Sequence, residues 1–489
     1  MINNPGNNVS MQDSPLLLEY IDRLKDKIDL PKNEKQAIID DFSALFEFYL
    51  KQGLSAQEAV TRLGENPLGN FYQIREPDEW YPLDSAAKVY PLSMTHSAVK
   101  MYRVSAYLTE KVVPCVLQVA LLTTIKRFPR FCTTIKRGVF WHYLDAAKVR
   151  YTVAQETMMP CTPIDVSRNR SLTFRVQYFE KRISFEAFHV LSDGAGALIF
   201  LKTLVAQYLK LLGKAIPADP EIFNLEETPS EKEWRNDFLI VDKTKSSTGL
   251  SEKLALQVRG KRTTVQPTKL SHYIFSAKEL LQIARDHNTT ISVLLIHAML
   301  LCAKASISRK KGWINIDVPV NMRKFYPSST LNNFSMYGVL SFRLEDVTED
   351  SAMLAQIAQK MAAKTSKEAM DKKISWINSF IGSPFIRFLP LFVKTLISRI
   401  SYMIVGEKTV TATLSNLGVV KCDFAGNVEQ FDFILGPTSI NIVGCAVGSY
   451  EDHMVLTITK STREPSFERS MLAYLQKLGL NIRVEEVSI

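Results

Sequence analysis

A histidine followed by an aspartate and a glycine is the pattern in this sequence that most readily suggests catalysis. Residues 189–194 run His-Val-Leu-Ser-Asp-Gly. A neutral imidazole can take a proton from a hydroxyl group that attacks a carbonyl carbon, so His189 is the candidate general base. A buried core histidine is the alternative. Asp193 precedes a predicted helix and is first of all an N-cap, a role compatible with catalysis, and Gly194 permits a tight turn.

The elements around this pattern are expected to position the imidazole. Apolar and polar residues alternate over 172–178 and again over 183–187, as in two half-buried strands. His189 has the same parity as the apolar residues of the second strand, so its side chain should point to the inward face. Apolar residues at helical spacing follow over 197–212, and Gly213 ends that helix. The sequence therefore predicts a strand, a turn that carries the imidazole, and a helix.

Other kinds of site find little support. The remaining six histidines and the six cysteines show no metal-ligand spacing, so no metal is expected. There is no Gly-x-Ser-x-Gly elbow and no phosphate-binding glycine loop. The formal net charge of +10 would attract nucleic acid, a membrane or an anionic cofactor. No nucleic-acid motif is recognisable, and nucleic acid is not an expected partner.

Composition and length describe an ordinary globular chain. It has 489 residues, too many for a single core, with 46% hydrophobic and 22% charged residues. Six cysteines without a pairing pattern and a polar start without a signal peptide favour a cytoplasmic location. The most apolar stretch, 379–405, carries three basic residues and two prolines. It fits a buried or interfacial helix pair, and weak membrane association is the alternative.

Residues 1–70 show the pattern of three short helices. The second has an apolar stripe from Ile38 to Leu50, and the third begins with a capping box of Ser55 and Glu58. Residues 20–66 resemble the small HAAS-type helical module. A three-helix unit this small is expected to bury its apolar stripe incompletely, which leaves a surface for a protein partner, a second copy or the main body. The alternative is an extension packed on the main body. We expect a chain that begins near Phe71 to stay folded and active.

From about residue 74 the pattern changes to mixed strands and helices, and it resumes after a polar connection. Helices are expected over 292–305 and 466–478, and strands over 314–320, 440–447 and 454–458. Two mixed halves joined by a crossover predict an α+β architecture. The expected units are the helical module 1–70, a first half 74–225, a crossover linker 226–264 and a second half 265–489.

Several segments together resemble the chloramphenicol-acetyltransferase-like superfamily, which includes condensation domains and alcohol O-acetyltransferases. The similarity covers about residues 74–489 and is greatest to bacterial alcohol-acetyltransferase-like proteins. Condensation domains usually carry two adjacent histidines, whereas here Phe188 holds the first position, which argues against peptide formation. In chain order, the matching segments are Trp80–Asp84, Tyr90–Pro91, Phe128–Phe131, Lys136–Trp141, Phe188–Ala197, Val318–Phe325, Leu331–Phe334 and Thr413–Gly418.

The resemblance implies two related halves packed as a V, with a central tunnel that the acyl donor and the acceptor enter from opposite sides. It implies an acyl-CoA-dependent O-acyltransferase with His189 as general base. The acceptor is a hydroxyl-bearing small molecule, acyl-CoA is a co-substrate, and no cofactor is tightly bound. Asp193 should face away from substrate and pair with an arginine, for which Arg323 is the candidate. Ser415 and Asn416 are candidate oxyanion donors, with a polar turn as the alternative.

Two other functions stay open. One is a non-catalytic scaffold that keeps the fold and uses its N-terminal helices for interaction. The other is an acyltransferase whose donor is bound to a carrier protein. The complete set of His189, Asp193 and Gly194 favours an enzyme, because a scaffold has no need of it.

Overall fold

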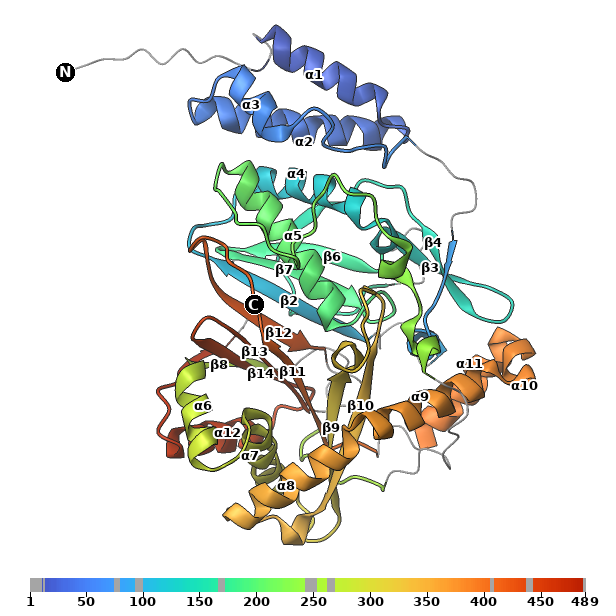
Figure 1. Ribbon diagram of the computed structural model, residues 1–489, viewed down its shortest axis with the longest axis vertical. Helices are drawn as coiled ribbons and strands as arrows, with labels where there is room; N and C mark the ends of the chain where they lie inside the picture. Colours follow the sequence, from blue (N-terminus) through green and yellow to red (C-terminus); the bar gives the residue numbers. More distant parts are fainter. Residues whose placement is uncertain are drawn as a thin grey trace, which may run out of the picture.

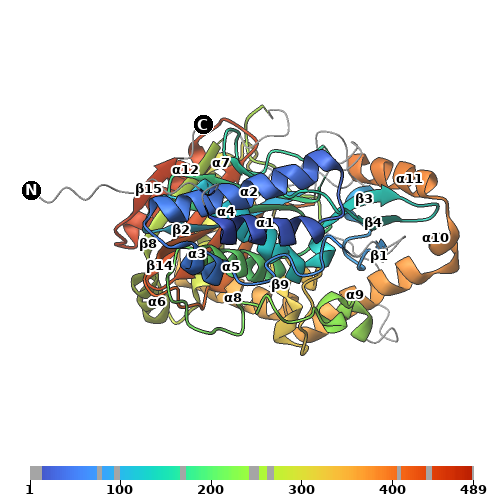
Figure 2. The ribbon, with the colours of Figure 1, turned by 90° about the horizontal axis from the view of Figure 1, so that it is seen from above.

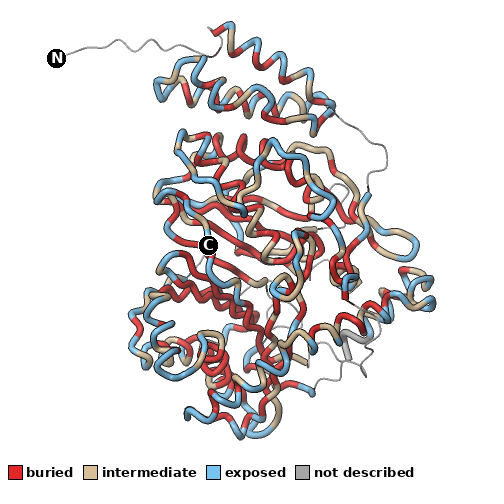
Figure 3. Tube along the Cα trace, in the orientation of Figure 1, coloured by how far each residue is buried: buried red, intermediate tan, exposed pale blue. Residues whose placement is uncertain are grey.

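The computed structural model describes residues 11, 14–73, 80–92, 100–165, 172–241, 253–261, 269–404, 409–436 and 443–486. The expected α+β fold of two halves is confirmed, with a layer of N-terminal helices against the first half (Figure 1). Buried residues concentrate on the strands of the two large sheets and on the helices that cover them (Figure 3). Because the candidates His189 and Asp193 belong to the first half and Arg323 to the second, a site that they form together must lie where the two halves meet.

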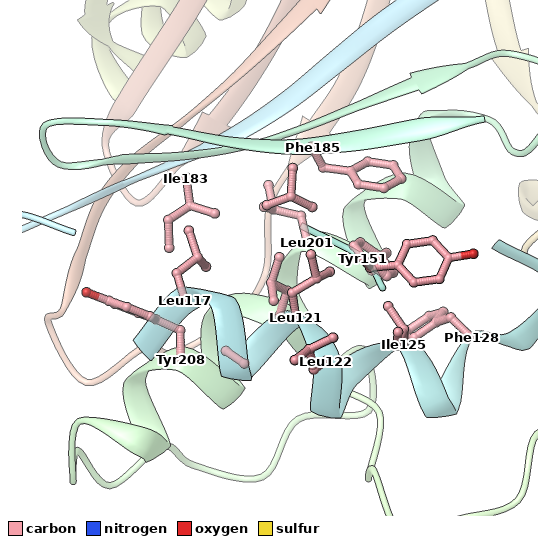
Figure 4. Packing of buried hydrophobic residues seen from close by; sticks show 14 of the residues in the cluster. Leu117, Leu121, Leu122, Ile125, Phe128, Tyr151, Ile183, Phe185, Leu201 and Tyr208 are labelled. Atoms are coloured by element: carbon pink, nitrogen blue, oxygen red, sulfur yellow. The ribbon is translucent and has the colours of Figure 1, made fainter. Parts of the chain in front are cut away.

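The first half is built on a five-stranded sheet. Helices α4 (Pro114–Thr124) and α5 (Gly194–Leu211) cover one face of this sheet, and their apolar side chains pack against the strands (Figure 4). In spatial order the strands are β12 (Val428–Leu435), β2 (Met101–Leu108), β7 (Arg182–Phe188), β6 (Phe174–Phe179) and β5 (Val153–Gln155). A small sheet at one end contains β1 (Trp80–Pro82), β4 (His142–Ala146) and β3 (Thr133–Arg137).

The strands before His189 are correctly predicted in position, but β7 is not half-buried. Every residue of β7 is buried, including the polar ones. Glu186 and Arg103 form an ion pair at 2.8 Å inside the protein. The second half covers this polar face of the sheet, where Asp432 of β12 lies 3.8 Å from His272. Alternation of polarity thus identified the two faces correctly, while burial of the polar face depends on the packing of the halves.

The second half is built on a seven-stranded sheet. Helices α6 (Ala277–Asp286), α7 (Ile291–Ser306) and α12 (Ser466–Lys477) pack in one apolar core with it. In spatial order the strands are β10 (Ser335–Arg343), β9 (Trp313–Asn321), β11 (Ala412–Val419), β13 (Val443–Tyr450), β14 (His453–Lys460), β8 (Lys269–Ser276) and β15 (Arg483–Glu486). Residues 440–442 of the predicted strand 440–447 lie outside the described residues.

One strand of the second half belongs to the sheet of the first. After β11 the chain leaves the seven-stranded sheet, and β12 pairs antiparallel with β2. It then returns as β13, which pairs parallel with β11. This exchange joins the halves by backbone hydrogen bonds, and the sequence pattern did not predict it.

Residues 379–404 form the outer part of a helical arm, and residue 405 of the stretch 379–405 lies outside the described residues. The arm consists of α8 (Ser351–Lys364), α9 (Lys367–Gly382), α10 (Pro384–Phe388) and α11 (Leu391–Ile404). It extends to the end of the molecule where β3 and β4 lie (Figure 2). Within the described residues, α5 is the one single helix long and apolar enough to cross a membrane, and 72% of it is buried in the fold.

The three N-terminal helices have the expected positions: α1 (Pro15–Asp26), α2 (Lys32–Lys51) and α3 (Ala56–Leu63). The capping box of Ser55 and Glu58 is present. These helices are not self-contained, because the apolar stripe of α2 lies in the same core as α4 and α5 (Figure 1). The Tyr49 hydroxyl donates to the Leu211 carbonyl at 2.7 Å, and Arg150 pairs with Asp41 at 2.6 Å. This packing agrees with the alternative of an extension on the main body, while the HAAS-type resemblance and the folding of a chain without these helices stay predictions.

Candidate active site

His189 lies in the turn between β7 and α5, as predicted. The backbone N–H of His189 donates to the Lys100 carbonyl at 2.8 Å, and Leu191 N–H donates to the Phe188 carbonyl at 2.9 Å. The Tyr102 hydroxyl holds the end of the turn through the Ser192 carbonyl at 3.1 Å. These bonds fix a half-buried imidazole at the junction of strand and helix.

Asp193 is the N-cap of α5 and also part of an ion pair between the halves. Its Oδ1 accepts the Gly196 N–H at 3.2 Å, as a cap should. Its Oδ2 accepts the Arg323 guanidinium at 2.8 Å and the Phe334 N–H at 2.9 Å. Burial alone would raise the pKa of Asp193, but the Arg323 guanidinium and these N–H groups hold it below its usual value. The predicted pair is thus formed, and its carboxylate stays ionised.

Arg323 also holds the loop that follows it. Besides Asp193, its guanidinium donates to the carbonyls of Thr330 and Asn332, each at 2.8 Å through Nη2. Part of the expected linker 226–264 holds the same loop from the other side. The Leu331 N–H donates to the Glu233 carbonyl at 2.6 Å, and Asn332 Nδ2 donates to the Trp234 carbonyl at 2.7 Å. The loop 330–334 therefore has a fixed conformation next to His189.

Asn333 in this loop decides which nitrogen of His189 carries the proton. Asn333 Nδ2 donates to Asp84 Oδ2 at 3.0 Å, because a carboxylate can only accept. The other end of the amide, Oδ1, then faces His189 Nδ1 at 2.9 Å. An amide oxygen accepts, so Nδ1 carries the hydrogen and Nε2 keeps its lone pair. Nε2 is hydrogen-bonded to none of the residues that the structure describes.

The surroundings of His189 favour the neutral imidazole. Burial has the largest effect and lowers the pKa of His189. The Asp193 carboxylate and the hydrogen bond with Asn333 oppose it, and the Lys100 ammonium adds a smaller lowering. The rings of Tyr90 and Tyr102 flank the imidazole at 4.9 and 5.0 Å between centroids. Burial raises the pKa of Asp84 to about 6, so that this carboxyl is mostly ionised at neutral pH. The imidazole is therefore available as a base at neutral pH.

Gly194 lies close to a side chain of the second half. A Cβ at this position would lie 2.8 Å from Leu417 Cδ2, which comes from β11 of the second half. Such a distance is too short for two carbon atoms, so Leu417 would have to move. The glycine of the motif thus lets β11 approach the first turn of α5.

The structure separates the two candidate oxyanion donors. Asn416 Nδ2 donates to the Ser292 hydroxyl at 3.2 Å, which places this amide on the side of β11 that faces α7. Leu414 packs in the core on the same side. Because side chains alternate along a strand, Ser415 faces the opposite side, toward the first half. Ser415 therefore stays a candidate, whereas the Asn416 side chain is directed away from that side.

Three charged or polar groups beside His189 have roles that the sequence did not indicate. Asp84 and Asn333 lie in segments quoted only for the family resemblance, and Lys100 lies outside those segments. Their distance along the chain hides the contact, since Asp84 and Asn333 are 249 residues apart.

The described residues contain no group of three histidine, cysteine, aspartate or glutamate side chains that could hold a metal ion.

Comparison with known proteins shows similarity at the level of structure. No family model and no curated protein matches the chain. The first condensation domain of the calcium-dependent antibiotic synthetase, bound to a substrate analogue, has 14% identity and a TM-score of 0.54, with 82% of this chain and 96% of that chain covered. The epimerization domain from the third module of tyrocidine synthetase B has 13% identity and a TM-score of 0.52, with 83% and 98% covered.

A third solved structure contains ligands. It is the starter condensation domain of rhizomide synthetase, a mutant in complex with C8-CoA and Leu-SNAC, with 11% identity and a TM-score of 0.51. The match covers 82% of this chain and 93% of that chain. Over most of its length, this chain therefore has the two-lobed fold of condensation domains.

Proposed function

We propose that this chain is an acyltransferase that moves an acyl group from a coenzyme A thioester to a hydroxyl acceptor, with His189 as general base. The observation that carries the proposal is the state of the imidazole. Its Nδ1 is fixed by Asn333 at 2.9 Å, and the causes given above keep its pKa low. An imidazole held in this way presents the lone pair of Nε2 to a substrate hydroxyl.

In the proposed reaction, Nε2 takes the proton of the acceptor hydroxyl while its oxygen attacks the thioester carbonyl. The tetrahedral intermediate then collapses with loss of the C–S bond, and the imidazolium returns the proton to the thiolate. Lys100 supplies positive charge beside His189, and Ser415 supplies a hydroxyl on the facing side of β11; both suit a developing oxyanion. Asp193 and Arg323 act as positioning residues, since their contacts hold the loop and the helix start rather than a substrate.

The coenzyme A donor is inferred from a solved structure of similar fold. One matched structure holds C8-CoA together with Leu-SNAC, so a related fold accommodates a coenzyme A thioester. The same fold occurs in domains of peptide synthetases, which leaves a carrier-bound donor as the alternative. A hydroxyl acceptor and a cytoplasmic location stay predictions from the sequence.

The test is thiol release by the purified full chain from a panel of acyl-CoA thioesters of different length, with hydroxyl compounds as acceptors. Thiol release that requires an acceptor is expected, and His189→Ala should lower it by about 100- to 10,000-fold. His453→Ala is the matched control, because this histidine is exposed on β14 and should not affect turnover. Full activity of His189→Ala would refute the general base.

The same assay separates the alternatives. Turnover with an acyl group on a carrier protein, but with none of the acyl-CoA thioesters, would refute coenzyme A thioesters as the donors. It would leave the proposed role of His189 as general base unaffected. No turnover with either donor would favour the non-catalytic scaffold.

A further inference from the structure

The outer helices of the arm expose large apolar side chains to solvent. Six such residues on α10 and α11 are between 43% and 75% exposed: Phe385, Phe388, Phe392, Leu396, Ile397 and Ile400. Single exposed apolar residues are common on protein surfaces, but a contiguous group of this size marks an interaction site.

α11 exposes its apolar face and buries its lysine, the reverse of what is usual for a helix at a surface in contact with water. Phe392, Leu396 and Ile400 lie four residues apart on one face of the helix, and this face is exposed. The lysine of the same helix is buried instead. Lys394 Nζ donates to the Phe140 carbonyl at 2.7 Å and lies 3.8 Å from the centre of the Trp141 ring. A surface helix in contact with water is expected to expose its charged residues and to turn its apolar residues toward the core.

The hairpin of β3 and β4 extends the same surface. Val139 and Phe140 at its tip are 73% and 39% exposed. The Leu391 N–H donates to the Val139 carbonyl at 2.9 Å, and the rings of Phe140 and Phe388 are 6.0 Å apart. The two hairpin residues and the six helical residues thus form one surface, here named the arm surface, at the end of the molecule where α10 and α11 lie (Figure 2).

Exposed basic side chains lie on the two helices of the arm surface: Arg387 on α10 and Arg399 on α11. The sequence 372–406 contains five basic residues, of which Lys394 is buried, and no aspartate or glutamate. The whole chain carries a formal net charge of +10. Exposed apolar residues next to exposed basic side chains complement a surface that is apolar inside and negative at its boundary.

We propose that the arm surface docks this protein on a membrane that contains anionic lipids, with α10 and α11 lying in the headgroup region. The exposed aromatic and aliphatic side chains would insert among the acyl chains, while the basic residues contact lipid phosphates. α11 also contacts the turn 90–92, and Tyr90 in that turn lies 4.9 Å from His189. Docking therefore holds the candidate site close to the membrane surface.

The test is flotation of the full chain with lipid vesicles, read as the fraction of protein that floats. Vesicles of phosphatidylcholine alone are compared with vesicles that also contain phosphatidylglycerol. The protein should float with the anionic vesicles, and salt should lower the bound fraction. Replacing Phe388, Phe392 and Leu396 together by serine should lower vesicle affinity by about tenfold or more, because apolar insertion is lost.

Matched variants control for composition and folding. Serine at Phe179, Leu281 and Val484, which are also exposed but lie away from the arm, should leave flotation unchanged. Lys372→Glu with Arg387→Glu should abolish the preference for anionic vesicles. Lys310→Glu with Lys311→Glu, exposed in another part of the chain, should have little effect. Unchanged melting temperatures would show that each variant is folded.

Three results would overturn the proposal. One is a full chain that fails to float with either vesicle. Another is flotation that the three serine substitutions on the arm do not weaken. The third is a protein that binds no vesicle but self-associates through the arm and becomes monomeric in the same variant, since this would make the arm surface a protein interface.

Discussion

Asn333→Ala should lower kcat about fivefold, because it removes the acceptor that fixes the tautomer of His189. In the ground state the Nδ1–H···Oδ1 bond of 2.9 Å joins two neutral groups and contributes about 1 kcal/mol. In the transition state the imidazole gains a proton and the bond becomes charge-assisted, which is worth about 1.5 to 3 kcal/mol. Because the variant loses both contributions, the barrier rises by their difference of about 1 kcal/mol, which corresponds to about fivefold in rate.

The pH dependence separates this role from a structural one. The bond from Asn333 favours protonated His189 and so raises its pKa. Its removal should move the acid limb of kcat/KM to lower pH, further below the usual histidine value of about 6.5. The neighbouring Asn332→Ala is the control, since it loses a bond to the Trp234 carbonyl at 2.7 Å and should lower stability without moving the limb.

Asp84→Asn tests the third residue in the chain of hydrogen bonds that joins His189, Asn333 and Asp84. Asp84 touches Asn333, with no contact to His189 among the described bonds, so it should act through the orientation of the Asn333 amide. The double variant with Asn333→Ala should then be no slower than Asn333→Ala alone. Additive losses would refute the role of Asp84 through Asn333. An Asn333→Ala protein with the turnover and pH profile of the unmodified chain would refute the role of Asn333 itself.

Three further predictions follow from the contacts around the site. Asp193→Asn and Arg323→Ala should each lower turnover, because each leaves the other member of the ion pair unpaired. The effect of the double variant should fall short of the sum of the single effects by more than about 0.5 kcal/mol. Additive effects in this double-mutant cycle would make Asp193 a helix cap alone. Lys100→Met removes a positive charge that makes a small contribution to the low pKa of His189, so the acid limb of kcat/KM should move slightly to higher pH while burial keeps it below the usual histidine value. An unmoved limb would show that Lys100 exerts no such effect. A chain that begins at Phe71 should melt well below the full chain or precipitate, because it uncovers the apolar side chains of α4 and α5; an unchanged melting temperature would show that α2 contributes little to the shared core.

Local patterns were enough to predict the secondary structure around the site. The alternation before His189, the cap at Asp193 and the glycine after α5 depend on residues a few positions apart, and the structure has each of them. The capping box of Ser55 and Glu58 and the helices of the second half follow the same rule. The pairing of Asp193 with Arg323 needed the family resemblance as well, since 130 residues separate the two.

Tertiary structure alone decided what surrounds the imidazole and what is exposed. Asp84 and Asn333 reach His189 because loops from both halves converge there, and no periodicity within one segment encodes that meeting. The same limit explains why Asn416 was a candidate although it faces α7, and why the sequence left open whether the helical stripe of α2 packs on the main body. In α11 the amphipathic pattern is present in the sequence, but only packing against the β3–β4 hairpin shows that the apolar face is outside. Patterns within a segment specify which side chains share a face, whereas the neighbour that covers that face is set by contacts between distant parts of the chain.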